Sequence, residues 1–362
     1  MARVTLQTIA DRVGVSRMTV SNAFSRPNQL SPTLRERILA AAQELGYVGP
    51  DPSARALAKG TTGAVGIVLT DSLGFAFTDL VSAQLLGAIA EELAPTGLAL
   101  TLLTSTNSGP LVPARDVPMD GALVYSCDPS SAAVSWLLQR QLPVVFIDQE
   151  PVGDIPSVNV ADREGARAAA QHLIDLGHRR IGLVLSGHYG PFGTIEDPDA
   201  LVDGYPSRQR LLGWLEALHG AGVKPLIVRQ HGSRVEQTPT SARLLLDRDE
   251  PPTAVLCFSD VIAFGVIQAA GDLGLRVPED LSVIGFDDNP LATQVRPALT
   301  TVRQDVKEKG RAAAAALTAA LSRSRPTGSS RPTGDSSSPT GGDVHRLLPA
   351  ELVIRDSTAP PA

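Results

Sequence analysis

The residues best suited to specific chemistry lie close to the N-terminus, between positions 16 and 24 (SRMTVSNAF). Arg17 can pair with guanine through two hydrogen bonds, Asn22 can pair with adenine, and Met18 can lie against the methyl group of thymine. If the segment is a helix, Ser21 lies on the same outer face. Together these side chains favour the reading of base edges in a DNA groove. The alternative is an amphipathic helix pair that packs and contacts nothing else.

Two short helices are needed to position that face. Apolar residues recur at helical spacing from Leu6 to Val13, which predicts a helix with one buried face. Gly14 is expected to end this helix, and Ser16 to cap the next one by accepting a hydrogen bond from a free backbone N–H. Val20 and Phe24 would then turn inward. The pattern is typical of two helices that cross at a tight turn.

A third helix and a local charge excess support this interpretation. Ser31 followed by Pro32 is a helix start, and that helix would run to Gly46. Residues 1–60 carry eight Arg or Lys and four Asp or Glu, a net charge of +4, whereas the whole chain carries −6. A basic segment on an acidic body concentrates the attraction for phosphate in one place.

The N-terminal sequence VTLQTIADRVGVSRMTVSNAFSRPNQLSPTLRERILAAAQELGYVGPDPSARALAKGTTGAVGIV resembles the opening of LacI/GalR transcriptional regulators. The resemblance continues through DREGARAAAQHLIDLGHRRIGLV, SDVIAFGVIQAAGDLGLRVPEDLSVIGFDDNPLA and PALTTVRQD. It implies that residues 51–60 form a hinge that becomes helical on the operator, with Leu57 wedged into the minor groove. The DNA-contacting residues that we expect are Thr5, Leu6, Ser16, Arg17, Met18, Thr19, Ser21, Asn22, Arg26, Ser31 and Leu57.

Length and composition limit the class of protein. A chain of 362 residues with 43% hydrophobic content can form a headpiece and one or two well-packed domains. No apolar stretch approaches the roughly 20 residues that cross a bilayer, and no secretory pattern opens the chain. We therefore expect a cytoplasmic, nucleoid-associated protein without a cofactor. Cys127 and Cys257 are interpreted as small buried hydrophobic residues and not as a disulfide or metal site.

From Ala64 onward, short apolar runs alternate with longer amphipathic ones, which is typical of a parallel sheet. The predicted fold is an all-α helix-turn-helix headpiece followed by a two-lobed α/β body that resembles periplasmic binding proteins. The chain is expected to cross between lobes near 148–160 and to return near 287–294. The predicted strands are 65–69, 99–103, 122–125, 144–147, 181–185, 226–228, 254–258 and 281–286, and the predicted helices are 80–93, 132–139, 164–176, 208–219, 242–247 and 261–273.

Ligands of open parallel sheets bind beyond the carboxyl ends of the strands, so a cleft between the lobes is the expected pocket. By resemblance, Arg210 and Asp287 occupy the principal effector-binding positions. Carboxylates accept hydrogen bonds from sugar hydroxyls and a guanidinium donates them, which suits a polyhydroxylated ligand. Asp260 has an alternative interpretation as a helix cap. Further expected contacts are the polar Asp148, Ser259 and Asp260, with Phe77 as an apolar wall.

The domain boundaries follow from these patterns. We expect a headpiece (1–49), a hinge (50–62), a body (63–321 and 344–356), a disordered insert (322–343) and a tail (357–362). The N-lobe would hold about 63–148, 291–321 and a closing strand in 344–356, and the C-lobe about 161–286. Three departures from the family stand out: Ala161-Asp162 in the crossing, which removes one polar pocket candidate, the long loop 187–207, and the insert with its repeated Pro-Thr-Gly.

The sequence therefore predicts a repressor that binds palindromic double-stranded operator DNA and whose affinity is controlled by a small ligand, with a sugar as the favoured class. A homodimer is expected because one headpiece buries too little surface to be selective. No leucine heptad follows Asp356, which argues against a tetramer. The alternatives are a solute-binding protein or a sugar-metabolising enzyme. The sequence shows no nucleophile elbow, phosphate-binding glycine loop or metal cluster, so we expect no enzyme activity.

Overall fold

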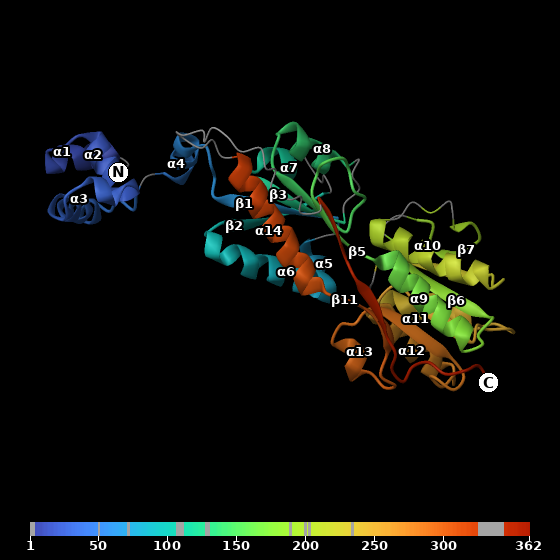
Figure 1. Cartoon of the computed structure of the whole chain (residues 1–362). Coiled ribbons are helices and arrows are strands. Elements are labelled where there is room, and N and C mark those ends of the chain that lie inside the picture. The colour runs from blue at the N-terminus through green and yellow to red at the C-terminus, as the bar shows by residue number, and fades with distance from the viewer. Residues whose placement is uncertain are drawn as a thin grey trace. The chain divides into compact units, whose positions relative to one another are not determined.

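The computed structural model describes residues 4–49, 51–70, 73–105, 112–126, 131–187, 190–198, 201, 204–232, 235–324 and 344–362. The chain divides into two compact units, Met1–Gly63 and Ala64–Ala362. The first unit is helical (Figure 1) and each unit is described by itself. Its elements are α1 (Leu6–Val13), α2 (Arg17–Ser25), the 3-10 turn η1 (Pro27–Gln29), α3 (Pro32–Glu44) and α4 (Pro52–Lys59).

The predicted caps of the first three helices are confirmed, and the third helix ends at Glu44, two residues before the predicted Gly46. The side chain of Ser16 accepts a hydrogen bond from Thr19 N at 3.0 Å, and Gly14 ends α1 with a left-handed φ of 77°. That φ favours glycine because, in the left-handed region, a Cβ crowds the residue's own backbone. Ser31 caps α3, and a proline follows it. The buried core of this unit consists of Ile9, Ala10, Val20, Ala23, Ile38, Ala41 and Ala42.

Residues 52–59 form helix α4 in this structure, whereas the sequence predicted that this hinge is helical only on DNA. Two local contacts explain the difference. Asp51 Oδ1 accepts a hydrogen bond from Ala54 N at 3.4 Å, and Gly60 N donates to Ala56 O at 2.8 Å. These bonds satisfy backbone groups that a short helix leaves free at its two ends.

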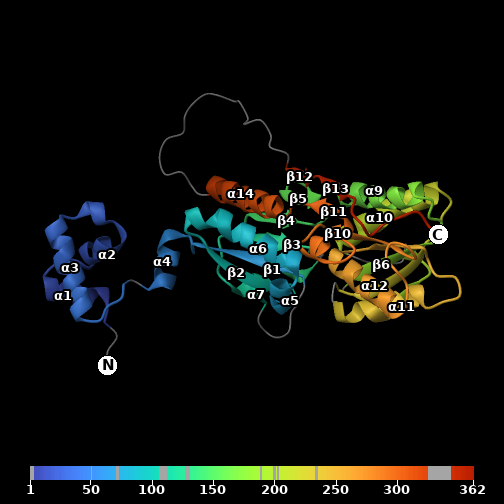
Figure 2. The same ribbon diagram turned by 90° about the horizontal axis from the view of Figure 1, so that it is seen from below.

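The body contains two sheets, as predicted. The first has the strand order β12-β5-β4-β3-β1-β2, with all of these pairs parallel, and defines the N-lobe. Helices α6 and α14 pack together on one face (Figures 1 and 2), and α7 and α8 pack on the other. The strands are β1 (Ala64–Leu69), β2 (Ala99–Thr104), β3 (Gly121–Tyr125), β4 (Val144–Ile147), β5 (Ser157–Val160) and β12 (His345–Leu348), and the helices are α5 (Leu73–Thr78), α6 (Leu80–Leu93), η2 (Ala94–Thr96), α7 (Pro113–Asp116), α8 (Ala132–Gln139) and α14 (Val306–Ser324).

The second sheet has the order β13-β11-β10-β9-β6-β8-β7 and defines the C-lobe. Its two edge strands, β7 and β13, are antiparallel to their neighbours. Helices α9 and α10 cover one face, and α11 and α12 cover the other. The strands are β6 (Ile181–Gly187), β7 (Gly193–Ile195), β8 (Leu226–His231), β9 (Ala254–Cys257), β10 (Ser282–Asp287), β11 (Thr300–Gln304) and β13 (Ala350–Val353), and the helices are α9 (Asp162–Asp175), α10 (Tyr205–Gly220), η4 (Val235–Gln237), α11 (Thr238–Leu246), α12 (Asp260–Asp272) and α13 (Leu291–Gln294).

The chain crosses between the lobes after β5, after β11 and between β12 and β13. The predicted return crossing near 287–294 is therefore wrong, because β11 pairs with β10 and keeps residues 291–304 in the C-lobe. The predicted closing strand is likewise two strands, one in each sheet. The sequences of β5 (SVNV) and β11 (TTVRQ) are polar for buried strands, so the apolar pattern misses them.

Other boundaries also differ from the prediction. Helix α14 includes Ser322–Ser324, and the remainder of the expected insert, 325–343, lies outside the described residues. Part of the long loop 187–207 forms β7, and its described remainder leads into α10. The expected tail is anchored in the C-lobe, since Ser357 Oγ accepts from Thr300 N at 2.8 Å and donates to Val283 O at 2.6 Å.

Glycines allow two helix pairs to approach closely. A Cβ on Gly213 of α10 would lie 2.1 Å from the carbonyl oxygen of Arg163 in α9. A Cβ on Gly310 of α14 would lie 2.8 Å from the Cβ of Ala88 in α6. Because interiors are close-packed, neither contact leaves room for a methyl group. These glycines let α10 pack closely against α9 and α14 against α6.

Candidate functional site

The outer face of α2 is accessible, as expected for a recognition helix. Arg17 and Arg26 are exposed, and the side chain of Met18 is 69% exposed. Ser21 and Asn22 are half-buried. Within the helical unit, α2 thus presents hydrogen-bond donors and one apolar side chain on a packed scaffold, which is the arrangement that base reading requires.

Several other predicted DNA contacts also have structural roles. The hydroxyl groups of Thr5, Ser16 and Ser31 accept hydrogen bonds from backbone N–H groups at the starts of α1, α2 and α3. Thr19 Oγ1 lies 2.8 Å from Ser16 Oγ, and Leu6 packs against the core. These residues therefore position helix N-termini, which are favourable sites for phosphate groups. On α4, Leu57 is 87% exposed.

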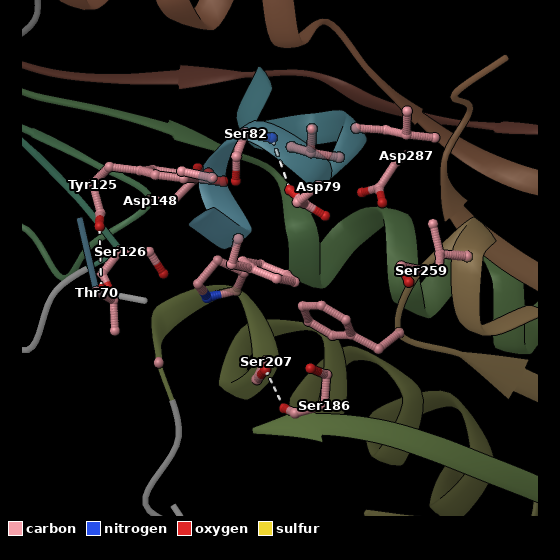
Figure 3. Close-up of a pocket in the computed structure, with 18 of the residues that line it drawn as sticks. Thr70, Asp79, Ser82, Tyr125, Ser126, Asp148, Ser186, Ser207, Ser259 and Asp287 are labelled. Carbon is pink, nitrogen blue, oxygen red and sulfur yellow. Dashed lines mark hydrogen bonds between the residues drawn. The ribbon is translucent and has the colours of Figure 1, made fainter. Parts of the chain in front are cut away.

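The body holds a cleft lined from both lobes (Figure 3). Its walls follow the carboxyl ends of the strands, as the parallel-sheet rule predicts. The N-lobe contributes residues at or just after the ends of β1, β3 and β4 and from α5 and α6. The C-lobe contributes residues at or just after the ends of β6, β9, β10 and β11 and from α10 and α12. The polar lining residues are Thr70, Asp79, Ser82, Tyr125, Ser126, Asp148, Ser186, Ser207, Arg210, Ser259, Asp287, Asn289 and Gln304.

Arg210 is the buried centre of the C-lobe wall. Its Nε donates to Asp162 Oδ1 at 2.8 Å, and its terminal nitrogens donate to Phe258 O at 2.5 Å and to Asp287 Oδ1 at 3.4 Å. The guanidinium carbon also lies 3.5 Å from the centroid of the Phe286 ring. Carboxylates on both sides and an aromatic face hold Arg210 in one orientation. Asp162 thus takes part in the site indirectly, by positioning Arg210.

A second buried cation, Lys309 of α14, joins the two lobes. Its Nζ donates to Asp148 Oδ2 in the N-lobe and, at 2.9 Å, to Gln304 Oε1 at the end of β11 in the C-lobe. The amide of Gln304 in turn donates to Asp287 Oδ1 at 2.7 Å. Asp148, Lys309, Gln304, Asp287 and Arg210 therefore form one continuous chain of hydrogen bonds and ion pairs beside the cleft, which we call the interlobe chain.

Burial raises the pKa values of the carboxyl groups in and behind the C-lobe wall of the cleft. Desolvation raises the pKa of Asp287 to about 7, although Arg210 and Gln304 oppose the shift by favouring the charged form. The pKa of Asp162 is raised by burial in the same way, again against the effect of Arg210. Burial also raises the pKa of Asp260 well above its ordinary value, and the charge of Asp287 adds to that shift. The carboxyl groups behind the cleft are thus held in a weakly solvated environment.

Three lining residues at strand ends have unusual backbone conformations. Ser126, Asp148 and Asp287 have positive φ values of 53°, 51° and 110°. Non-glycine residues adopt such values at an energetic cost, and they gather at binding sites where the surrounding structure enforces them. The backbone thus places these three side chains at the cleft.

Comparison with known proteins identifies the family. Residues 5–50 match the family model of bacterial regulatory proteins, lacI family, and residues 170–358 match a periplasmic binding protein-like domain. An HTH-type transcriptional regulator of Mycolicibacterium smegmatis is 34% identical over 99% of this chain and 98% of its own length. The chain belongs to the LacI family of transcriptional regulators. The DNA-binding match favours this class over the solute-binding protein or enzyme that the two-lobed body alone would allow.

Solved structures of the LacI family agree with the whole architecture. The Lac repressor dimer bound to operator and the anti-inducer ONPF matches with a TM-score of 0.73 and 25% identity, covering 99% of this chain and 100% of that one. A complex of the transcriptional regulator CelR with cellobiose matches with a TM-score of 0.64 and 26% identity, covering 98% and 100%. The predicted fold, a headpiece followed by a two-lobed body, is confirmed.

Two of the effector residues expected from the LacI-family resemblance do not line the cleft. Phe77 is 64% exposed and is not among the residues that line the cleft, whereas Phe75, two residues earlier on α5, does line it. Asp260 is fully buried and accepts hydrogen bonds from Thr301 Oγ1 at 2.5 Å and Asn289 N at 2.9 Å. It is not the cap of α12 either, because Ser259 accepts the bond from Ile262 N. Asp148, Arg210, Ser259 and Asp287 do line the cleft.

Sequence reasoning missed several lining or supporting residues of this LacI-family site. Gln304 was hidden because β11 has no clear apolar pattern, and Lys309 lies inside an otherwise ordinary amphipathic helix. Asp79 caps α6 by accepting from Ser82 N at 2.8 Å, a role that its position before Leu80 could have suggested. His178, which follows the end of α9, is buried, and its Nε2 lies 2.8 Å from Ala359 O.

Among the described residues, His, Cys, Asp and Glu form no group that could hold a metal ion. No helix in the part of the chain with assigned structure is long and apolar enough to cross a bilayer. Cys257 is a buried free thiol, as expected, whereas Cys127 lies outside the described residues.

Proposed function

We propose that the protein is a cytoplasmic repressor that binds palindromic operator DNA as a homodimer. Its affinity for that DNA falls or rises when a small sugar binds in the cleft. The relative with bound cellobiose and the Lac repressor dimer on its operator support the ligand class and the assembly. We expect no turnover of the ligand. The proposal assigns base reading to the outer face of α2 and minor-groove insertion to Leu57.

The interlobe chain is the observation that supports ligand control most directly. A ligand that contacts Asp148 and Asp287 touches both ends of the segment that runs through Lys309 and Gln304. This part of the interlobe chain spans the crossing from β11 in the C-lobe to α14 in the N-lobe. A change in its hydrogen bonds therefore changes the relative stability of two alternative arrangements of the lobes. In a dimer, a change in lobe angle alters the spacing of two headpieces, and coupling of about 1–3 kcal/mol would suffice to regulate binding.

The proposal is tested by a gel mobility shift on DNA from upstream of the protein's own coding sequence, repeated with a panel of sugars and nucleosides. We expect specific binding that one ligand weakens or strengthens. The variant Asp287→Ala should bind the same DNA and lose the response to that ligand, because it removes a carboxylate from the cleft and leaves the headpiece intact. An Asp287→Ala protein that responds like the wild type would refute the assignment of the site.

A further inference from the structure

The turn at the end of β10, residues 287–289, has a costly backbone conformation. It carries two residues that line the cleft, Asp287 and Asn289. Asp287 and Asp288 have φ values of 110° and 51°, so two successive residues other than glycine have a positive φ. Such conformations persist only where the surrounding structure enforces them. The turn therefore needs contacts from other elements that keep its two lining residues in place.

Ion pairs hold one side chain of this turn. Asp288 accepts hydrogen bonds from Arg303 Nε at 2.7 Å and from Arg355 Nη2 at 2.5 Å. The Arg303 side chain is 52% exposed, and exposed ion pairs contribute little to stability because water screens them. Both contacts act on the side chain of Asp288, whereas a buried backbone N–H group needs a partner of its own.

Asp260 supplies that partner from the opposite side. It is the first residue of α12, and it is 0% exposed. Its Oδ2 accepts a hydrogen bond from the backbone N–H of Asn289 at 2.9 Å, and its Oδ1 accepts from Thr301 Oγ1 of β11 at 2.5 Å. Hydrogen bonds in a weakly solvated interior are stronger than in water. The carboxyl group of Asp260 thus joins α12, the turn and β11.

Strand β10 leaves room for this carboxyl group. A Cβ on Gly285 would lie 2.3 Å from Asp260 Oδ1 and 3.1 Å from Asp260 Cα. The φ of Gly285 is not positive, so its backbone conformation does not call for glycine. The missing side chain serves the close approach of Asp260 to the strand, since a methyl group there would displace the carboxyl group.

We propose that Asp260 is a positioning residue of the cleft. Its carboxyl group holds the turn 287–289 so that Asp287 and Asn289 keep their places in the lining. Asp260 is not itself among the lining residues, so it acts through the turn. This inference deepens the proposed function and rests on it, since it names a residue that positions the effector site from behind.

Hydrogen exchange resolved to single amides in the full-length protein tests this bond without a ligand. In the wild type, the Asn289 N–H should exchange at least about 10³-fold more slowly than an unprotected amide, because its acceptor is buried. Its rate is compared with that of Ile284 N–H in the middle of β10, which follows the stability of the sheet. In Asp260→Ala, the ratio of the two rates should rise at least about tenfold because Asn289 loses its acceptor.

A conservative variant should restore the protection. In Asp260→Asn, the amide oxygen can accept from Asn289 N, and the hydroxyl of Thr301 can accept from the amide nitrogen. If Asp260→Ala does not fold, Thr301→Val removes only the hydroxyl that orients the carboxyl group, and the ratio should rise about threefold. Unprotected exchange of Asn289 in the wild type overturns the proposal, and so does a wild-type ratio in folded Asp260→Ala or, in its place, in Thr301→Val.

Ser357→Ala is the matched control for a general loss of stability. Ser357 Oγ also joins β10 to β11 through buried hydrogen bonds, to Val283 O and Thr300 N at the beginnings of these strands. The control should lower the midpoint of unfolding and leave the exchange ratio of Asn289 to Ile284 unchanged. A ratio that rises as much in Ser357→Ala as in Asp260→Ala contradicts the positioning role.

Operator binding with the panel of sugars and nucleosides separates this inference from the proposed function. Asp260→Ala should bind the operator like the wild type and need at least about tenfold more of a compound that acts on the wild type. Ser357→Ala should respond at the wild-type concentration. An Asp260→Ala protein that also responds at that concentration overturns the positioning role and leaves the regulator intact. If no compound changes operator binding by the wild type, the proposed ligand control fails, and the exchange ratios alone decide whether Asp260 holds the turn.

Discussion

Replacing Lys309 with methionine tests the interlobe chain. Methionine keeps most of the volume of the lysine stem, so the change removes mainly the ammonium group of a residue that is 1% exposed. Within the described structure Asp148 Oδ1 has no hydrogen-bond partner, so the loss of Lys309 leaves both carboxylate oxygens of Asp148 without one. Gln304 Oε1 also loses its donor. Removing one member of a buried ion pair costs about 3–5 kcal/mol. We expect the free energy of unfolding of the body to fall by that amount.

A double variant distinguishes the charge effect from a packing effect. Asp148 has a φ of 51°, which asparagine tolerates better than an apolar residue does, so Asp148→Asn is the suitable partner change. In Lys309→Met with Asp148→Asn no uncompensated carboxylate remains. The coupling energy should be about 2 kcal/mol, and the double variant should be at least as stable as Lys309→Met alone. The exposed Lys307→Met on the same helix is the control and should change stability by less than about 0.5 kcal/mol.

Urea unfolding followed by tryptophan fluorescence reports on the unfolding of both lobes. The chain has two tryptophans, Trp136 on α8 of the N-lobe and Trp214 on α10 of the C-lobe. Replacing one or the other with phenylalanine gives a reporter for each lobe. With a urea dependence of about 3 kcal/mol per molar, Lys309→Met should lower the midpoint by about 1–2 M. An unchanged midpoint together with additive effects in the double variant would refute the energetic role of Lys309.

Three further predictions concern packing, pH and DNA. Gly213→Ala should destabilise the body by about 1–3 kcal/mol because its Cβ would lie 2.1 Å from a backbone oxygen of α9, whereas Gly87→Ala, which meets nothing within 4 Å, should be neutral or stabilising in the same urea titration. Since the folded-state pKa of Asp287 is raised to about 7, the folded state holds the proton more tightly than the unfolded chain does, and stability should fall as pH rises from about 4 to 7. Asp287→Asn should flatten that part of the thermal stability profile, and an equally steep profile would contradict the shift. In operator titrations, Asn22→Ala should relax the choice of base at one position, whereas Arg26→Ala should weaken all DNA roughly equally, and identical selectivity in the two variants would contradict this division of roles.

The sequence predicted the elements that carry strong local signals. The helix caps Ser16 and Ser31, the C-cap Gly14 and the bounds 80–93 of α6 are all present in the structure, because capping and amphipathic spacing are local properties. Arg210 and Asp287 were placed at the cleft by the family resemblance, together with the rule that ligands bind beyond strand ends.

The errors arose where tertiary contacts override local pattern. Strand β11 is buried although it reads TTVRQ, because it pairs with β10 on one side and β13 on the other, and missing it misplaced the lobe crossing and hid Gln304. Lys309 resembles any helical lysine until α14 is folded against β4, where it meets Asp148. Phe75 and Phe77 are two residues apart on α5 and therefore lie on roughly opposite faces of the helix. The sequence does not determine which of these faces meets the cleft.

The central claim is that the headpiece of each chain binds one half of a symmetric operator and that the body only changes the affinity of this binding. Fluorescence anisotropy with a palindromic duplex, a single half-site and a scrambled duplex, at several salt concentrations and with and without the ligand, tests it most directly. The account predicts at least about 10³-fold preference for the palindrome over the scrambled duplex, two chains bound per palindrome, affinity that falls steeply with salt, and a shift when ligand is added. Equal affinity for the three duplexes in the presence and absence of ligand would contradict it.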